Sequence, residues 1–315
     1  MGSTSIDSTV AILSIGQMGV GIAQVLVANK YQVITNVSDR SAATKARASS
    51  AGIQLYNTDE EVVAHADYFL SIVPPRDAIA TAERVRDALA GAKRMEGRPL
   101  YYLDLNAISP ETAKKIAGLF EPVADRLQLI DGGIIGGPPA PSKQHASGWT
   151  KPGVPLSGPV SLSNTGTMGA HLAEVLNTKH IGPDIGTASG LKCCFAAISK
   201  GFTALVLQSF TTASSLGVLQ PLKEYMDQYN VNARQKAEKN IVGCTGKAYR
   251  WVEEMNQINE CFSTAGAWQD QATVFREIAS VFQGLADVVE EQGIQDMKDD
   301  ESVVSSLSKK LHAQP

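Results

Sequence analysis

Short apolar runs alternate with amphipathic stretches through the first half of the chain. Stretches with the apolar spacing of helices separate runs with the character of buried strands. The strand-like runs are residues 10–15, 33–36, 68–73, 100–104 and 129–132, and the helical stretches are 20–29, 42–51, 76–90 and 110–119. Such alternation is typical of a parallel sheet with crossover helices. The pattern predicts an α/β fold with a doubly wound Rossmann sheet.

The second half has no comparable strands. Residues 188–216 fit one long, largely apolar helix, and residues 236–289 have helical character with polar and apolar faces. The character changes at 180–186, HIGPDIG, a Gly/Pro boundary. We therefore expect a Rossmann domain at 1–181 and an all-α domain at 182–315. The loop at 136–153 is too rich in Pro, Gly and Ser for regular structure.

The first strand-like run leads into a glycine turn and a helix. In this segment, VAILSIGQMGVGIA, Gly16 and Gly19 occupy the second and third glycine positions of G-x-G-x-x-G, and Ser14 occupies the first. The second glycine lets backbone approach a pyrophosphate, and the third lets the helix pack closely on the strand. A plain strand–turn–helix is the alternative. The βαβ context favours a cofactor loop.

The end of the second strand-like run bears on the choice of nicotinamide cofactor. NAD enzymes commonly place an acidic residue there to bind the ribose 2′-hydroxyl. This chain has neutral Asn36, followed by Ser38, Asp39 and Arg40, a set that suits a 2′-phosphate better than a second anion would. Asp39 could instead serve a ribose, and a helix start capped by Ser41 is the structural alternative. We expect NADP(H) in preference to NAD(H).

Composition narrows the possible partners and location. The chain has 315 residues, 43% hydrophobic and 19% charged, with a net charge of −4, which gives no reason to expect nucleic acid or an anionic membrane as partner. No fully apolar run approaches the roughly 20 residues of a membrane span, and no basic segment followed by an apolar stretch opens the chain. The 4 cysteines and 5 histidines lack metal spacing. We expect a cytoplasmic protein with buried, reduced thiols and no metal.

Several segments together resemble the β-hydroxyacid dehydrogenase (3-hydroxyisobutyrate dehydrogenase-like) superfamily. SIGQMGVGIA is similar to its glycine loop, and HADYFLSIVPP resembles the strand whose terminal loop lies beside the nicotinamide ribose. LDLNAISPETA and DGGIIGG resemble its motifs D-x-S-T-x-x-P and D-A-P-V-S-G-G. GKAYRWVEEMNQI resembles the helical C-terminal domain of the 6-phosphogluconate-dehydrogenase-like subgroup, to which imine reductases are related. The resemblance spans nearly the whole chain.

The resemblance assigns roles to individual residues. GTASGLK is similar to the segment that carries the family's catalytic lysine, which implies that Lys192 is the general acid/base. Together with the glycine loop and the turn after the second strand-like run, the resemblance gives these expected cofactor-binding residues: Gly16, Gln17, Met18, Gly19, Asn36, Ser38, Arg40, Val73, Pro74, Pro75 and Asn106. The implied substrate-binding residues are Asn106, Ile135, Gly136, Gly137, Lys192, Trp251 and Met255.

Some positions depart from the family pattern. Asn106 and Ala107 replace the Ser and Thr of the substrate motif, and Ile135 replaces the Ser of S-G-G. These family residues would bind the carboxylate of a small hydroxy acid. We therefore expect a substrate other than the 3-hydroxyisobutyrate type, larger or less polar.

Lys192 suits the chemistry that this family performs. Hydride transfer to a carbonyl builds negative charge on the oxygen, and a positioned proton donor lowers the barrier. Because Lys192 is near the start of a long apolar helix, desolvation should lower its pKa. The alternative is a lysine that extends to solvent. Lys200, two turns further on, is more consistent with a structural or solvent-facing role.

These observations predict an NADP(H)-dependent oxidoreductase acting on a small-molecule carbonyl or alcohol. The long apolar helix suggests a homodimer. We thus expect NAD(P) binding in the domain at 1–181, and substrate binding and dimerisation in the helical domain at 182–315. An imine reductase or reductive aminase is a close alternative, although such enzymes usually lack the lysine. A non-catalytic NADP-binding regulator or scaffold is the alternative of another class, because the substrate motifs are substituted.

Overall fold

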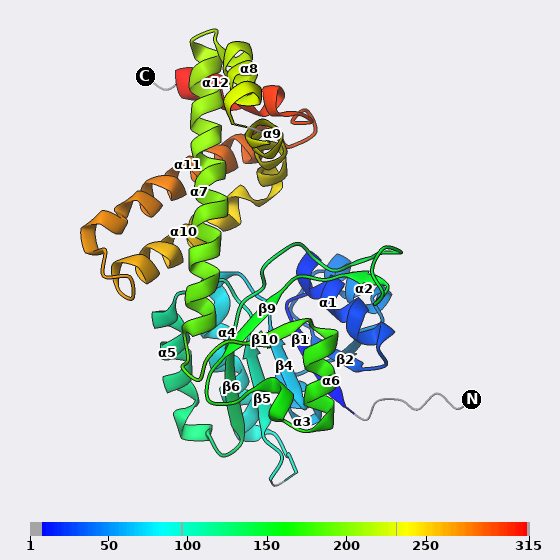
Figure 1. Ribbon diagram of the computed structural model, residues 1–315. Helices are drawn as coiled ribbons and strands as arrows, with labels where there is room; N and C mark the ends of the chain where they lie inside the picture. Colours follow the sequence, from blue (N-terminus) through cyan, green and yellow to red (C-terminus); the bar gives the residue numbers. More distant parts are fainter. Residues whose placement is uncertain (1–7, 96, 231, 314–315) are drawn as a thin grey trace. The chain divides into compact units, whose positions relative to one another are not determined.

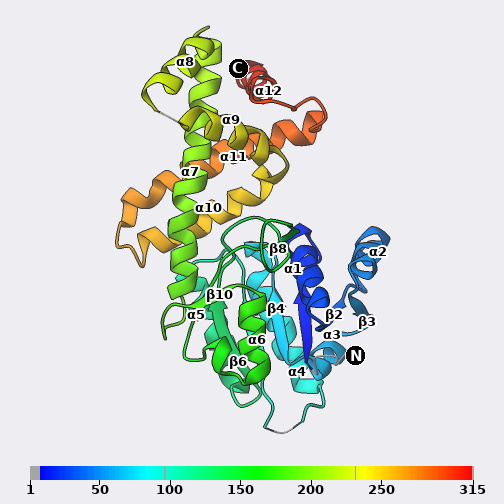
Figure 2. The same cartoon turned by 45° about the vertical axis from the view of Figure 1, so that its right-hand side comes forward.

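The computed structural model describes residues 8–95, 97–230 and 232–313. Residues 1–7, on which the expectation about a secretory signal depends, lie outside this part. The chain divides into two compact units, residues 1–193 and 194–315, and Figures 1 and 2 trace the elements of each. The division falls within helix α7 (Thr187–Ser215). The expected domain limit after residue 181 stays a prediction.

The first unit is built on an eight-stranded sheet with the strand order β10-β9-β6-β5-β4-β1-β2-β3. The six adjacent strands from β3 to β6 have the doubly wound 3-2-1-4-5-6 order of a Rossmann fold and are parallel. Strand β9 pairs antiparallel with β6, and β10, which is parallel to β9, runs in the same reversed direction. The strands are β1 (Thr9–Leu13), β2 (Gln32–Asn36), β3 (Gln54–Tyr56), β4 (Tyr68–Ser71), β5 (Leu100–Asp104), β6 (Leu127–Gly132), β9 (Val154–Ser157) and β10 (Thr178–His180). The predicted α/β class is confirmed.

Alternate residues of the strands point into two cores, one on each face of the sheet. On β1, Val10 and Ile12 face one core, while Ala11 and Leu13 face the other. Helices α1 (Gln17–Ala28), α2 (Ala42–Ser50) and α6 (Thr167–Val175) cover the first core. Helices α3 (Asp59–His65), α4 (Ala78–Gly91) and α5 (Pro110–Phe120) cover the second, as can be followed in Figure 1. Short 3₁₀ turns lie at η1 (Pro75–Asp77), η2 (Glu121–Val123) and η3 (Leu162–Asn164).

The Pro/Gly-rich segment after β6 has regular structure, contrary to expectation. Strands β7 (Ala140–Pro141) and β8 (Trp149–Thr150) pair antiparallel, and Ile135 bridges to Gly153. Packing onto α1 explains this order. Pro139 is buried, and a Cβ at Gly21 would come within 2.9 Å of its Cδ atom, so the absent side chain makes room for the proline.

The second unit is helical, as predicted. It comprises α7 from Cys194 onward, α8 (Leu219–Tyr229), α9 (Ala233–Cys244), α10 (Ala248–Ser263), α11 (Val274–Gln292) and α12 (Asp300–Ala313), with 3₁₀ turns η4 (Thr245–Lys247) and η5 (Gln269–Thr273). Its apolar core includes Met255, Phe282 and Leu285, all fully buried. Lys223 on α8 is also buried, and its ammonium group lies 2.7 Å from Asp300 and 3.0 Å from Glu301 on α12. Because a buried cation must be paired, this contact joins α8 to α12.

Helix α7 is long and apolar enough, by length and composition, to cross a membrane. One such helix is weak evidence, because the core helix of a soluble protein passes the same test. The expected cytoplasmic location stays a prediction. All four cysteines are free; Cys193, Cys244 and Cys261 are buried, whereas Cys194 on α7 is exposed, which differs from the expected burial.

Candidate cofactor and active site

The two glycines in the turn between β1 and α1 have different structural roles. A Cβ at Gly19 would lie 2.0 Å from the Ser14 carbonyl oxygen, so only glycine allows this approach of helix and strand. A Cβ at Gly16 would meet only the Ser14 Oγ atom, at 3.9 Å. Gly16 is the N-cap of α1 and leaves its backbone open at the helix N-terminus, where N–H groups and the helix dipole favour phosphate. Gln17 and Met18 form the first turn, with Gln17 exposed and Met18 half-buried.

A residue outside the predicted set supports this turn. Arg47 on α2 donates a hydrogen bond from Nη1 to the Ile15 carbonyl oxygen at 3.0 Å. The contact joins residues 32 positions apart in sequence. Its only sequence signal is a basic residue in the helix after β2, which does not specify the partner.

The turn after β2 is organised by Asn36. Asn36 is buried; its Oδ1 accepts the Ser38 N–H at 2.9 Å, and its Nδ2 donates to Asp59 at 2.8 Å. Lys45 donates to the Ser38 carbonyl at 2.9 Å, and the exposed Arg40 forms an ion pair with Asp39 at 3.4 Å. Asn36 therefore shapes the turn, while Ser38 and Arg40 remain at its surface.

Asn106 ties together the loops that follow β4 and β5. Its Oδ1 accepts the Val73 N–H at 2.7 Å, and its Nδ2 donates to Ser71 at 2.9 Å. Its own N–H donates to Asp104 at 3.0 Å. Asn106 is only 2% exposed, so both of its amide atoms serve to position this edge of the sheet. Pro74 caps the 3₁₀ turn that begins at buried Pro75.

A row of buried polar residues crosses the sheet just below these loops. Ser71, Asp104, Asp131 and Ser157 are register partners on β4, β5, β6 and β9. Burial raises the pKa of Asp104 to about 7, and Asp131 also raises it. Within the described residues the Asp104 Oδ2 atom has no hydrogen-bond partner, whereas Asp131 is amply bonded. Asp104 is therefore the carboxyl group of this pair that more readily holds a proton.

Lys192 lies in the first turns of α7 and reaches back to the end of β6. Its side chain packs on Gly133, where a Cβ would come within 2.9 Å of the Lys192 Cβ. Its Nζ donates to the Ile134 carbonyl oxygen at 2.5 Å. Burial lowers the pKa of Lys192 from 10.5. The ammonium group is thus held in a desolvated position, not extended into solvent.

The predicted substrate residues fall into both units. Ile135, Gly136 and Gly137 directly follow the Ile134 carbonyl that Lys192 contacts. The Ile135 N–H and C=O both pair with Gly153 at 2.9 Å. The structure therefore brings these three residues and Lys192 to one end of β6.

Trp251 and Met255 belong to α10 in the second unit, and their part in substrate binding stays a prediction. Met255 is fully buried, and Trp251 packs edge-on against Phe282 at 5.1 Å between ring centroids. Lys200 is buried, forms an ion pair with Glu254 and lies 5.3 Å from the Trp251 ring centroid. The structural role expected for Lys200 agrees with these contacts.

Two family models match the chain. Residues 9–93 match the model described as NADP oxidoreductase, coenzyme F420-dependent. Residues 213–285 match a domain of unknown function. The first match covers the glycine loop, the turn after β2 and the loop after β4.

The chain is also similar to individual proteins along most of its length. An uncharacterized 28.5 kDa protein of Methanothermus fervidus is 27% identical over 208 residues, which are 64% of this chain and 69% of that protein. A solved protein of unknown function, described as similar to 3-hydroxyacid dehydrogenases, is 24% identical with a TM-score of 0.59 over 90% of this chain and 99% of its own.

Two solved enzymes share the fold at lower identity. The 3-hydroxyisobutyrate dehydrogenase of Salmonella typhimurium is 17% identical, with a TM-score of 0.61 over 95% of this chain and 99% of its own. An imine reductase of Myxococcus stipitatus, solved with NADP+, is also 17% identical, with a TM-score of 0.52 over 95% and 99%. The resemblance to hydroxyacid dehydrogenases and imine reductases that the motifs predicted is confirmed.

The buried row makes stability depend on pH through Asp104. Its pKa is about 7 in the folded chain against 3.8 for the unperturbed group, so the folded state binds the proton more tightly. Stability from this group therefore falls as pH rises from about 4 to 7, by up to about 1.4 kcal/mol per pH unit. Asp104→Asn cannot ionise at this position. Its free energy of unfolding minus that of the native protein, measured by urea titration, should rise across this pH window and level off above it. Asp125→Asn, at an exposed site, controls for loss of one charge. A constant difference between Asp104→Asn and the native protein would contradict this account.

Proposed function

We propose that the protein is an NADP(H)-dependent oxidoreductase that interconverts a carbonyl compound and an alcohol, with Lys192 as general acid/base. The observation that carries this proposal is the placement of Lys192. Its Nζ is held on the Ile134 carbonyl at the carboxyl end of β6, in the same unit as the glycine loop. Ligands of doubly wound sheets bind outside the carboxyl ends of the strands.

The residues at this edge suit a nicotinamide dinucleotide. Gly16, Gln17, Met18 and Gly19 would hold the pyrophosphate, because Gly16 leaves the α1 N-terminus open to close approach. The phosphate of NADP(H) would lie by Ser38 and Arg40 in the turn that Asn36 shapes. Val73, Pro74 and Pro75, held through Asn106, would flank the nicotinamide ribose. When bound, the nicotinamide supplies or accepts the hydride.

Lys192 moves the proton in this scheme. In reduction, its ammonium form donates a proton from Nζ to the carbonyl oxygen of the substrate as negative charge develops there. In oxidation, the neutral amine accepts the proton of the alcohol. Burial lowers the Lys192 pKa and so makes the neutral form more accessible. The Ile134 carbonyl fixes the direction of the amine.

The hydrogen bonds of two predicted substrate residues support a substrate less polar than 3-hydroxyisobutyrate. Both amide atoms of Asn106 and both backbone groups of Ile135 are hydrogen-bonded within the protein. A substrate carboxylate would have to displace these bonds.

The shared fold of imine reductases supports a second candidate, reduction of C=N bonds. Assays of aldehydes, hydroxy acids and cyclic imines with NADPH separate the two. NADPH binding with no turnover on this panel would favour a non-catalytic regulator or scaffold.

A change at Gly16 tests the cofactor loop without disturbing the fold. Gly16→Val should weaken NADPH binding by about a hundredfold, or about 2.7 kcal/mol, because the side chain fills the space over the helix N-terminus. The melting temperature should change little, since a Cβ there has a nearest neighbour at 3.9 Å. Calorimetric titration measures the affinity, and Gly118→Val, at an exposed position of α5 with nothing within 4 Å, is the matched control. Unchanged NADPH affinity would show that the segment is only a turn. The native protein should bind NADPH more tightly than NADH.

Removal of the Lys192 amine tests the mechanism. Lys192→Ala should lower kcat by a factor of about 10²–10⁴, the usual contribution of a general acid or base, with NADPH affinity retained. In the native enzyme, kcat/KM for alcohol oxidation should rise with pH because the neutral amine is required. The apparent pKa of this rise should lie below 10.5. Steady-state kinetics provide both measurements. Lys179→Ala, at an exposed lysine of the same unit, should leave kcat unchanged. Equal turnover in Lys192→Ala and native protein would rule out this role.

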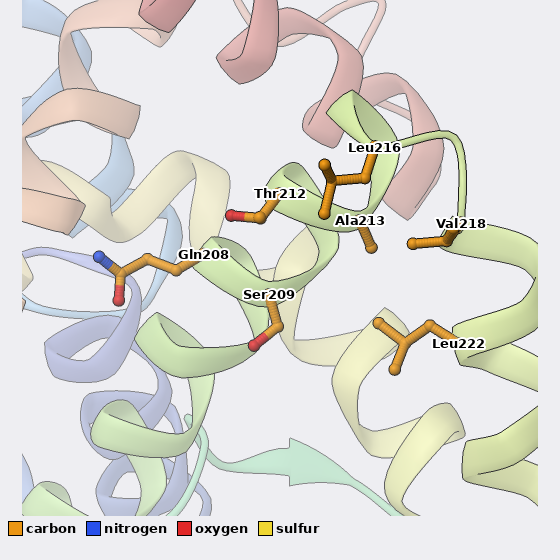
Figure 3. A pocket seen from close by; sticks show the side chains of 7 residues that line it. All are labelled: Gln208, Ser209, Thr212, Ala213, Leu216, Val218 and Leu222. Carbon is orange, nitrogen blue, oxygen red and sulfur yellow. The ribbon is translucent and has the colours of Figure 1, made fainter.

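We also propose that α7 pairs with a second copy of the chain. Within the second unit, one stripe along α7 has alternating steps of three and four residues, the spacing of a helix-pairing seam. Its positions are 195, 198, 202, 205, 209, 212 and 216. Phe195, Ile198, Leu205 and Leu216 on this stripe are exposed. The stripe ends at a groove of about 400 Å³ between α7 and α8, shown in Figure 3. Its lining residues are Gln208, Ser209, Thr212, Ala213, Leu216, Val218 and Leu222.

A charge on the stripe should break this pairing. Leu205→Glu should raise the dimer dissociation constant by about tenfold or more, because the carboxylate would be buried in an apolar seam. Sedimentation velocity measures the assembly, and Gln235→Glu at an exposed site on α9 is the control for added charge. A native protein that sediments only as monomer would refute the dimer, as would a native monomer that floats with phospholipid vesicles.

A further inference from the structure

Asp131 places a buried carboxylate at the N-terminus of α7. It lies in β6 and is fully buried. Its Oδ2 accepts the N–H groups of Gly186, Ala188 and Ser189 at 3.0, 3.1 and 3.2 Å. Two hydroxyls add to these bonds, from Ser189 at 2.5 Å to Oδ1 and from Ser157 at 2.8 Å to Oδ2. The carboxylate thus satisfies N–H groups that an uncapped helix start leaves without partners.

Lys192 makes a second contact between α7 and the end of β6, so that Asp131, Ser189, Lys192 and Ile134 form a closed ring of contacts. It follows Ser189 by three residues on α7, so the carboxylate fixes the turn that precedes it. Its stem then packs on Gly133, and its Nζ bonds the Ile134 carbonyl, two and three residues beyond Asp131 on the other chain segment. The end of β6 therefore contacts α7 at both the helix start and the lysine amine.

We propose that Asp131 is the positioning residue for Lys192: its bonds to the first turn of α7 hold the lysine amine on the Ile134 carbonyl. This inference rests on the proposed function for its catalytic meaning, but the geometry that it describes exists without substrate. Burial raises the pKa of Asp131, while the hydrogen bonds from Ser189, Ser157 and the Gly186 amide act in the opposite direction and stabilise the carboxylate at the helix N-terminus.

Few other groups around this ring could change the titration of Lys192. Asp104 on β5 is the register partner of Asp131, and Ser157 on β9 is its partner on the other side. The pKa of Lys192 is lowered mainly by burial, while Cys193 acts in the opposite direction. Release of the helix start would let the amine reach water, and its titration would then move toward that of a free lysine. A purely structural carboxylate would affect stability without this change.

Asp67 offers a matched control within the same unit. It also accepts a backbone N–H, from Thr9 at 3.0 Å, and a hydroxyl, from Ser8 at 3.2 Å. It precedes β4, at the opposite end of the sheet from Lys192. Asp67→Asn and Ser8→Ala therefore remove the same kinds of bond away from the proposed ring.

Trace acetylation of the native, full-length chain at a series of pH values, read by mass spectrometry, tests the proposal. In the native protein Lys192 should titrate below 10.5, and in Asp131→Asn its midpoint should move up toward 10.5. Asp67→Asn should leave the Lys192 midpoint unchanged. In parallel, kcat of Asp131→Asn should fall about tenfold to a hundredfold with NADPH affinity retained, as expected for a misplaced catalytic group.

A second variant keeps the test decisive if Asp131→Asn does not fold. Ser189→Ala removes one hydroxyl from the carboxylate and should shift the Lys192 midpoint in the same direction by a smaller amount, with Ser8→Ala as its control. A Lys192 midpoint equal to that of the native protein in the folded variants would overturn the proposal. A shifted midpoint in an enzyme without turnover on any substrate would support the positioning role and refute the proposed function.

Discussion

The burial of one carboxylate, Asp131, is the constraint on which the rest of the site depends. A buried anion is costly unless donors surround it. Here the donors are the first amides of α7 and two hydroxyls, so solvation of the charge also determines where α7 begins. Lys192 is one turn further along. The position of the lysine at the end of β6 is therefore a consequence of how the sheet satisfies its own buried acid.

Close approaches of backbone set the remaining geometry. At Gly19, Gly21 and Gly133 an added Cβ would collide with Ser14, Pro139 and Lys192 respectively. These glycines let α1 pack against β1, let the β7–β8 hairpin pack on α1, and let the lysine pack on the end of β6. Gly16 differs, because its surroundings leave space. The first position of the glycine motif is Ser14, while Gly16 leaves its backbone open and Gly19 allows the close approach of helix and strand.

The sequence pattern predicted what depends on local periodicity. The five central strands, four of their crossover helices and α7 follow from apolar spacing and from caps such as Ser109, whose Oγ accepts the Thr112 N–H. The short strands β3, β9 and β10 and the short helix α3 have too few residues to show a period. The hairpin at 140–150 depends on contacts with α1. Lys192 and Asn106 were found through motifs, but their supporting contacts are distant in sequence. Arg47 bonds a residue 32 positions away, the Asn106 side chain bonds residues 33 and 35 positions away, and Asp131 bonds residues 26 to 58 positions away, which local spacing does not specify.

Two features of the first unit, an open helix N-terminus at Gly16 and a desolvated amine at Lys192, make up the proposed site. A crystal structure with NADP+ bound tests this union most directly. The account predicts the pyrophosphate on the backbone of Gly16 to Gly19, the extra phosphate beside Arg40, and the nicotinamide ring next to the Lys192 amine. A cofactor bound away from the glycine loop, or a Lys192 side chain turned into solvent with the cofactor in place, would contradict it.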